Sequence, residues 1–178
     1  TAKRMGAIVF ATDVRMASKE QVESLGGKFL SVDGYENLET EGGYAKEASD
    51  EFKKKQEELL AETIKKIDIV ICTALIPGKK APVIIKDDMI KSMQSGSVIY
   101  DLAAVQGGNT ALTEVDKIIE INGVKIIGEK NILNKLPVSA SGLYAKNVFN
   151  FVSNLYDKEN QKLNIDMEDE IIKTTLVK

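Results

Sequence analysis

Short apolar runs rich in β-branched residues alternate with amphipathic stretches along most of the 178-residue chain. The apolar runs fall at residues 7–12, 28–32, 68–73, 97–101 and 124–128. The amphipathic stretches fall at residues 18–26, where Ser18 is the expected helix cap, and at 45–66, 86–94 and 139–156. This alternation predicts an α/β protein: an open parallel sheet with helices on both faces and right-handed crossovers. The tail, residues 163–178, alternates acidic and apolar residues, and we expect two short strands there.

The composition excludes several kinds of chemistry. The chain has no histidine, which removes the commonest general base and all imidazole metal sites. Its single cysteine, Cys72, rules out an internal disulfide or a thiolate metal cluster, so we expect a buried core thiol and no metal site. With 24 basic and 27 acidic residues the net charge is −3, which argues against nucleic-acid binding. Any chemistry must rely on carboxylates, lysine, tyrosine, backbone groups or a cofactor.

Three of the predicted strands end in small or polar residues. These ends are Thr12-Asp13, Cys72-Thr73-Ala74 and Asp101-Leu102-Ala103. Ligands of open parallel sheets bind beyond the carboxyl ends of the strands. We therefore expect the three loops to converge on one crevice.

Asp13 ends the first apolar run. In a dinucleotide-binding Rossmann unit, an acid about 20 residues past the glycine-rich loop bonds the adenosine ribose. Only 12 residues precede Asp13, so we expect that loop and its strand upstream of Thr1, which leaves the Rossmann-like sheet incomplete at its N-terminus. The alternative is that Asp13 only caps a helix or forms a turn. As a ribose ligand, its carboxylate would repel a 2′-phosphate and favour NAD over NADP, although Arg15 could accept that phosphate.

Two glycines and a tyrosine, residues 42–44, lie between an acidic loop and the start of a helix. The glycines permit close approach of the backbone to a ligand, and Tyr44 could cover a nucleotide as the loop closes. Equally, the segment could be a flexible linker whose tyrosine packs on the helix.

The segment 73–78, Thr-Ala-Leu-Ile-Pro-Gly, directly follows an apolar run. Its small residues could admit an adenine ring against the backbone, with Leu75 as an apolar cover. The alternative is a plain rigid turn between a strand and a helix. The next loop along the chain, 101–109, offers the side-chain amides of Gln106 and Asn109.

Several short motifs occur in the order that they have in one known family. They are TAKRMGAIV (1–9), DVR (13–15), GGYAK (42–46), TALIPG (73–78), GSVIYDLAA (96–104), GGN (107–109) and LYAKN (143–147). Together they resemble the NAD(H)-binding domain of the alpha subunit of proton-translocating nicotinamide nucleotide transhydrogenases. The likeness runs from one end of the chain to the other.

The resemblance implies that the chain binds NAD(H) and presents it for direct hydride transfer to NADP+ on a partner domain, coupled to proton translocation across a membrane. It implies no catalytic side chain, because the cofactors supply the chemistry. It places an acid at the ribose, a valine beside the adenine, a mobile loop over the nucleotide and small residues in the adenosine pocket. The residues expected to bind the cofactor are Asp13, Val14, Arg15, Gly43, Tyr44, Thr73, Ala74 and Leu75.

The resemblance also implies partners and a location. The partners are an NADP-binding domain, a membrane domain or subunit, and a second copy of this domain. The location is the cytoplasmic face of a bacterial inner membrane or the matrix face of a mitochondrial one. Residues 1–136 correspond to a nucleotide-binding subdomain, and residues 137–178 to a helix and a segment that returns to a further subdomain.

Two alternatives remain open. One is an alanine dehydrogenase-like, NAD-dependent oxidoreductase. Those relatives carry an acid directly before the Gln-Gly-Gly turn to support proton transfer, and this chain has Val105 there. The other is a non-catalytic nucleotide-binding or dimerisation module.

Overall fold

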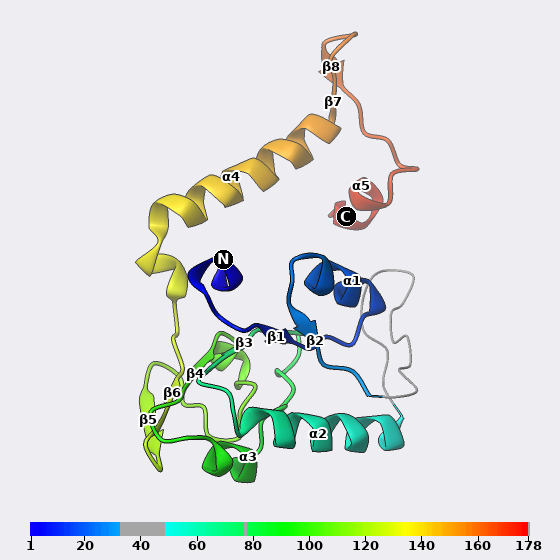
Figure 1. Cartoon of the computed structure of the whole chain (residues 1–178). Coiled ribbons are helices and arrows are strands. Elements are labelled where there is room, and N and C mark those ends of the chain that lie inside the picture. Colours follow the sequence, from blue (N-terminus) through cyan, green and yellow to red (C-terminus); the bar gives the residue numbers. More distant parts are fainter. Residues whose placement is uncertain (33–48, 77, 178) are drawn as a thin grey trace. The chain divides into compact units, whose positions relative to one another are not determined.

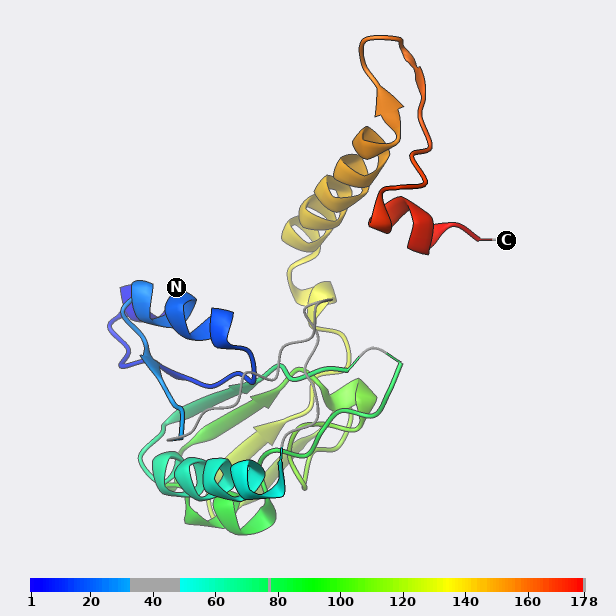
Figure 2. The same ribbon diagram turned by 90° about the vertical axis from the view of Figure 1, so that its right-hand side faces the viewer.

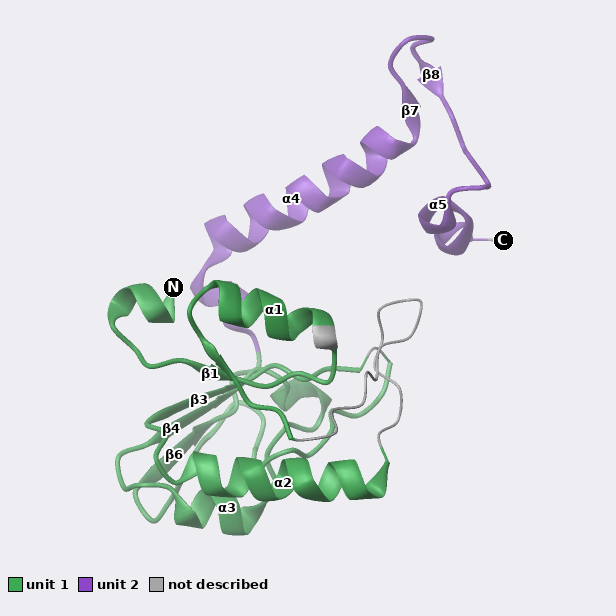
Figure 3. Ribbon diagram, turned by 45° about the vertical axis from the view of Figure 1, so that its right-hand side comes forward, with its two compact units in different colours: residues 1–130 green, residues 131–178 purple. Residues whose placement is uncertain are grey.

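The computed structural model describes residues 1–32, 49–76 and 78–177, and Figure 1 shows the order of their elements. The chain divides into two compact units, Thr1–Lys130 (unit 1) and Asn131–Lys178 (unit 2) (Figure 3). The expected division after Leu136 stays a prediction. Across the described ranges, no helix has both the length and the apolar character that crossing a bilayer requires.

Unit 1 contains a four-stranded sheet and a separate pair of short strands. The sheet has the order β3-β4-β6-β5, in which β3 (Ile69–Cys72), β4 (Val98–Asp101) and β6 (Val124–Ile127) are parallel neighbours. The separate pair, β1 (Phe10–Ala11) and β2 (Lys28–Phe29), is also parallel. The predicted α/β class with parallel strands is therefore confirmed, and every one of these strands lies within an apolar run.

The fourth strand of the sheet, β5 (Ile118–Ile121), runs antiparallel to β6 and lies outside the sequence-based prediction. Asn122 and Gly123 join the two strands, with φ values of 52° and 78°. Asn-Gly with two positive φ values forms the two-residue hairpin turn whose twist matches the flanking strands. The sheet is mixed at this edge because a two-residue turn leaves no room for the crossover that a parallel strand requires.

The core of unit 1 lies between the sheet and two helices, α2 (Asp50–Ile64) and α3 (Asp87–Ser92), which cover one face (Figure 2). On the opposite face of β3, Ile69 and Ile71 are exposed. The buried core residues are Ile64, Cys72, Ile85, Met89, Ile90, Met93, Ile99, Val124 and Ile126.

The helices of unit 1 begin at different kinds of residue. Ser49 precedes α2, and its Oγ accepts a hydrogen bond of 3.3 Å from the backbone N–H three residues on. The expected cap at Ser18 is wrong, because α1 (Met16–Ser24) begins directly after Arg15. The Asp13 carboxylate accepts the Arg15 N–H at 3.0 Å, and this turn starts the helix earlier than a serine cap would.

Two short 3₁₀ helices, η1 (Ala2–Met5) and η2 (Ala104–Gln106), also lie in unit 1. Each ends at a glycine in the left-handed conformation, Gly6 with φ 91° and Gly107 with φ 99°. Glycine adopts this backbone conformation without the steric cost that a side chain would add, so the chain can change direction sharply after each 3₁₀ helix.

Unit 2 consists of α4 (Pro137–Asn154), the 3₁₀ helix η3 (Ile132–Lys135), the strand pair β7 (Tyr156–Asp157) and β8 (Lys162–Leu163), and α5 (Glu170–Thr175). The structure describes all of α4, and none of its residues is buried. The sequence predicts two short strands in the tail, residues 163–178. Beyond Leu163, where β8 ends, this prediction is wrong, because the tail forms the helix α5. Asp169 caps α5 there, because its carboxylate accepts the N–H of Ile172 at 3.0 Å.

Candidate functional site

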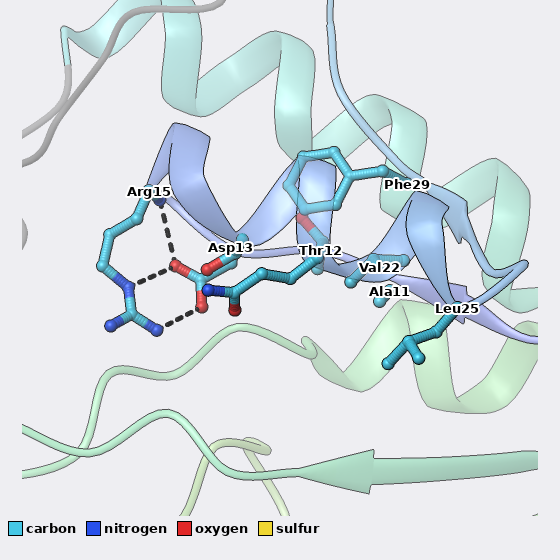
Figure 4. A pocket seen from close by; sticks show the side chains of 9 residues that line it. Ala11, Thr12, Asp13, Arg15, Val22, Leu25 and Phe29 are labelled. Atoms are coloured by element: carbon cyan, nitrogen blue, oxygen red, sulfur yellow. Dashed lines mark hydrogen bonds and ion pairs between the residues drawn. The ribbon is translucent and has the colours of Figure 1, made fainter.

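Asp13 and Arg15 lie where β1 leads into α1. Arg15 bonds the Asp13 carboxylate through its backbone N–H and Nε, both to Oδ1 at 3.0 Å, and through Nη2 to Oδ2 at 2.8 Å (Figure 4). The side-chain hydrogen bond of Arg15 is the main reason why the pKa of Asp13 lies below its ordinary value of 3.8, and partial burial opposes this shift. The carboxylate is therefore ionised at neutral pH and fixed in orientation.

A pocket of about 370 Å³ opens beside this ion pair. A carboxylate offers about four lone-pair sites, so Asp13 can accept donors in addition to Arg15. The carboxylate could accept hydrogen bonds from the two ribose hydroxyls, and the apolar lining could contact the flat adenine base. These residues therefore fit the adenosine half of a dinucleotide. The polar lining is Thr12, Asp13, Arg15, Ser18 and Gln21, and the apolar lining is Ala11, Val22, Leu25 and Phe29.

The loop after β3 carries three of the expected site residues, of which Thr73 and Leu75 are exposed and Ala74 is half-buried. The side chain of Asn109 holds the Ala74 backbone. Its Oδ1 accepts the Ala74 N–H at 3.0 Å, and its Nδ2 donates to the carbonyl oxygens of Ala74 and Pro82, both at 2.8 Å. The polar backbone groups of Ala74 are thus bonded within the protein, and the loop presents the apolar side chain of Leu75 to solvent.

Asp101 ends β4 and is 0% exposed. Its Oδ1 accepts the Ala103 N–H at 2.9 Å. Its Oδ2 accepts the N–H groups of Asn109 and Thr110, at 2.7 and 3.3 Å, and the hydroxyl of Thr113. No lysine or arginine in the part of the chain that the structure describes forms an ion pair with it. The protein's own donors therefore replace water around this buried carboxyl group.

Backbone hydrogen bonds join the loop after β3 to the loop after β4. The N–H of Ala81 donates to the carbonyl of Gln106 at 2.8 Å. The N–H groups of Ile84 and Ile85 both donate to the carbonyl of Asn109, at 2.8 and 3.0 Å. The two loops therefore form one hydrogen-bonded layer at the carboxyl end of the sheet.

Gly108 lets the loop after β4 fold back over Asp101. Its φ is 80°, in the left-handed region. A Cβ at this position would lie 2.6 Å from Thr113 Cβ and 2.9 Å from Asp101 Oδ2. Both the backbone conformation and the available space therefore require glycine.

The structure brings some of the expected site residues together and leaves others apart. Asp13 and Arg15 share the pocket, and Val14 lies half-buried between them. The described lining of that pocket comes from residues 11–29, so the loop after β3 does not contribute to it. Gly43 and Tyr44 lie outside the described residues.

Two residues that hold the loops after β3 and β4 in place, Asp101 and Asn109, are absent from the residues expected to bind the cofactor, although Asp101 is one of the predicted strand ends and Asn109 one of the predicted loop amides. A signal for each exists in the sequence. Asp101 is an acid that ends an apolar run, as Asp13 is, and Asn109 follows two glycines in a loop at the carboxyl end of the sheet. Neither signal predicts which residues the two side chains contact, because those residues lie in other parts of the chain.

Cys72 lies in the core, as predicted. Burial, and to a smaller extent the nearby Asp101, raise the pKa of its thiol to about 12. The thiol is therefore protonated and unreactive at neutral pH. Within the described ranges, no group of three histidine, cysteine or acidic side chains could hold a metal ion.

Comparison with known proteins connects this geometry to a family. The family model "Alanine dehydrogenase/PNT, C-terminal domain" matches residues 1–178. The first part of the NAD(P) transhydrogenase alpha subunit of Rhodospirillum rubrum is 52% identical over 179 residues, which cover 99% of this chain and 47% of that protein. The crystal structure of transhydrogenase from Sinorhizobium meliloti matches with a TM-score of 0.76 and 45% identity, over 98% of this chain and 45% of that one.

An L-alanine dehydrogenase structure matches with a TM-score of 0.65 and 21% identity, over 86% of this chain and 38% of that chain, and shows the shared Rossmann-like fold. The chain spans about half the length of the relatives that it matches, 47% and 45% for the two transhydrogenases. The resemblance to transhydrogenase alpha subunits, first seen in the ordered motifs, is confirmed by these identities. The chain belongs to the family of alanine dehydrogenase/PNT C-terminal domains.

Proposed function

We propose that this chain binds NAD(H) and presents it for direct hydride transfer to NADP+ on a partner domain, coupled to proton translocation across a membrane. The observation that carries the proposal is the Asp13 carboxylate, ionised and fixed at the end of β1 beside a pocket of adenosine character. The names of the relatives, NAD(P) transhydrogenase subunit alpha and transhydrogenase, support the reaction class.

Asp13 would accept hydrogen bonds from the adenosine ribose hydroxyls, and Val14 would lie beside the adenine. The guanidinium of Arg15 donates two hydrogen bonds to the carboxylate of Asp13, one from Nε and one from Nη2. A 2′-phosphate would place its negative charge against Asp13 and would have to compete for the guanidinium. The ion pair therefore favours NAD over NADP.

In the proposal, the loop after β3 adds apolar contacts to the bound adenosine from outside the described lining of the pocket beside Asp13. Thr73, Ala74 and Leu75 would contact the adenosine, with Leu75 as the cover. Gly43 and Tyr44, outside the described residues, would form the loop that closes over the bound nucleotide.

The bound nicotinamide ring supplies the hydride chemistry. This chain contributes binding and orientation, which require no proton-handling side chain. Val105, directly before Gln106, is 60% exposed and cannot hold or move a proton. Because the resemblance places an acid at this position in alanine dehydrogenases, Val105 favours a transhydrogenase over an alanine dehydrogenase-like oxidoreductase.

The remaining half of the site and the partners would come from outside these 178 residues. In the proposal, residues 1–136 form a nucleotide-binding subdomain whose glycine-rich loop and first strand lie elsewhere, and residues 137–178 return to a further subdomain. The exposed apolar side chains of Ile69 and Ile71 on β3 support this arrangement. The partners would be an NADP-binding domain, a membrane domain or subunit and a second copy of this domain, at the cytoplasmic face of a bacterial inner membrane or at the mitochondrial matrix face.

The test is Asp13→Asn in the complete protein that carries this chain. The change keeps the shape of the side chain, but it removes the negative charge and replaces one of the two oxygens that would accept hydrogen bonds from the ribose hydroxyls. We expect the Kd for NADH, measured by fluorescence titration, to rise about ten- to a hundredfold. An unchanged Kd would remove the ribose assignment.

The matched control is Asp157→Asn in unit 2. Like Asp13, Asp157 accepts a backbone N–H two residues on, from Glu159 at 3.0 Å, so the control loses a comparable turn and the same charge. Its NADH affinity should equal that of the wild type.

Activity assays of the wild-type complete protein separate the alternatives. Hydride transfer from NADH to an NADP+ analogue indicates a transhydrogenase, and reduction of NAD+ by alanine indicates an alanine dehydrogenase-like enzyme. Nucleotide binding without either reaction indicates the non-catalytic module.

A further inference from the structure

We infer that Asn109 is a positioning residue: its buried side-chain amide fixes the Ala74 peptide, and with it the apolar surface that the loop after β3 offers to an adenosine. The inference rests on the proposed binding of NAD(H) and adds a residue to that site. Through Asn109, the loop after β4 would set the shape of the loop after β3.

Every polar group of Asn109 has a partner within the protein, and the residue is 0% exposed. Its side chain accepts one hydrogen bond, from Ala74 N–H, and donates two, to backbone carbonyls. Its own N–H donates to Asp101, and its own carbonyl accepts from Ile84 and Ile85. The partners also fix the orientation of the amide, because exchanging its oxygen and nitrogen would set an N–H against the Ala74 N–H and an oxygen against two carbonyls.

The position of Asn109 is set by the sheet itself. Asp101 is the last residue of β4, and its Oδ2 accepts the Asn109 N–H at 2.7 Å. Ala74 lies two residues past the end of the adjacent strand, β3. The side chain of Asn109 therefore connects the ends of two paired strands and bonds Ala74, two residues beyond Cys72, which pairs with Asp101 at the end of the ladder.

This arrangement determines what a ligand meets at the loop. Because the N–H and the carbonyl of Ala74 are both bonded to Asn109, they are not available to a nucleotide, and the loop offers apolar surface next to Leu75. Without the amide, three backbone groups in the loop, those of Ala74 and the carbonyl of Pro82, would need water or a new conformation. The loop would then lose the shape and the apolar character that suit an adenine ring.

The test compares Asn109→Asp with the wild type in the complete protein. The change nearly preserves the shape and retains an acceptor for Ala74 N–H, but it removes both donated hydrogen bonds and sets a carboxylate oxygen against two carbonyls. We expect the Kd for NADH and the Kd for 5′-AMP to rise by the same factor, about tenfold, because the affected surface contacts the adenosine half. The Kd values are measured at a temperature where circular dichroism shows both proteins folded.

The matched control is Ser97→Ala at the opposite end of β4. Ser97 is also buried, and its Oγ donates one hydrogen bond of 3.1 Å to the carbonyl of Ile67. The control loses a buried hydrogen bond far from the loop, so both Kd values should stay at the wild-type level. An equal loss of affinity in this control would overturn the inference, because general destabilisation would then explain both variants.

Unchanged affinity in folded Asn109→Asp would also overturn the inference. If that variant does not fold, amide exchange of the wild type decides: the Ala74 N–H should be protected without nucleotide, and free exchange there would overturn the inference. The proposed function fails in a different way, through a wild-type protein that binds neither NADH nor 5′-AMP.

Discussion

Asp13 and Asp101 occupy the same position in the sequence pattern, since each stands at the end of an apolar run, yet the structure places them in opposite environments. The Asp13 side chain is 30% exposed, and its main partner, Arg15, is only two positions away. Asp101 is fully buried, and its donors come from residues up to 12 positions away, because the loop after β4 folds back over it. An acid at a strand end is therefore open to a ligand only where the following loop leads away from it.

The largest effect in this comparison should come from Gly108, which permits the loop after β4 to cover Asp101. In Gly108→Ala, the left-handed backbone and the overlap with Thr113 should together lower the free energy of unfolding by about 3 kcal/mol. The control is Gly96→Ala, which has a φ of 94° but nothing within 4 Å of the new Cβ, so we expect only about 1 kcal/mol. Urea unfolding measures the free energy of unfolding of both variants. Equal decreases would show that the loop after β4 does not pack closely against Thr113 and Asp101.

A smaller effect should separate two threonines, one in each region. In Thr113→Val, the buried Asp101 loses the hydroxyl that donates to it, and we expect the free energy of unfolding to fall by about 1–3 kcal/mol. Thr12 is exposed, and its hydroxyl accepts a long hydrogen bond of 3.3 Å from Gln56. Thr12→Val should therefore change the stability by less than about 0.5 kcal/mol. Similar values for the two variants, measured by urea unfolding, would remove the contrast between the regions.

The smallest effect should come from the ion pair at Asp13. Because its folded-state pKa lies below the ordinary value of 3.8, the pair stabilises the fold above that pH, and the contribution is lost as the pH falls through the depressed value. Since Arg15 is 45% exposed, Arg15→Gln should lower the free energy of unfolding at neutral pH by only about 0.2–1 kcal/mol. The difference from wild type should shrink in unfolding experiments below pH 3.8, and a difference that grows there would contradict the assignment.

Much of the fold could be predicted because buried parallel strands leave continuous apolar runs. β3 lies within the predicted run 68–73, and β6 lies within 124–128. β5 does not stand out in the same way, since its edge position leaves Ile118 and Glu120 exposed, and the informative signal was the Asn-Gly turn that follows it. In the tail, the alternation of acidic and apolar residues predicts strands, but the segment after Asp169 is helical. Asp169 caps this helix, and a cap is a local signal that the alternation does not contain.

The site could be predicted only where its geometry is local. Asp13 and Arg15 interact across two positions, so a strand-end acid and its neighbours carry most of the information. The contact between Asn109 and Ala74 spans 35 positions and depends on the pairing of β3 with β4. An asparagine after two glycines is typical of an exposed turn, and only the tertiary fold turns it into a buried bridge.

The single thiol of the chain gives this edge of the sheet a built-in chemical probe. Cys72 is the last residue of β3, next to the loop that Asn109 holds, and its pKa of about 12 leaves almost no thiolate while the sheet is closed. A disulfide reagent can react only when the strand end opens far enough to hydrate the sulfur and to separate it from Asp101. The rate of labelling at Cys72 therefore reports how often this end of the core of unit 1 opens to solvent, without any engineered label.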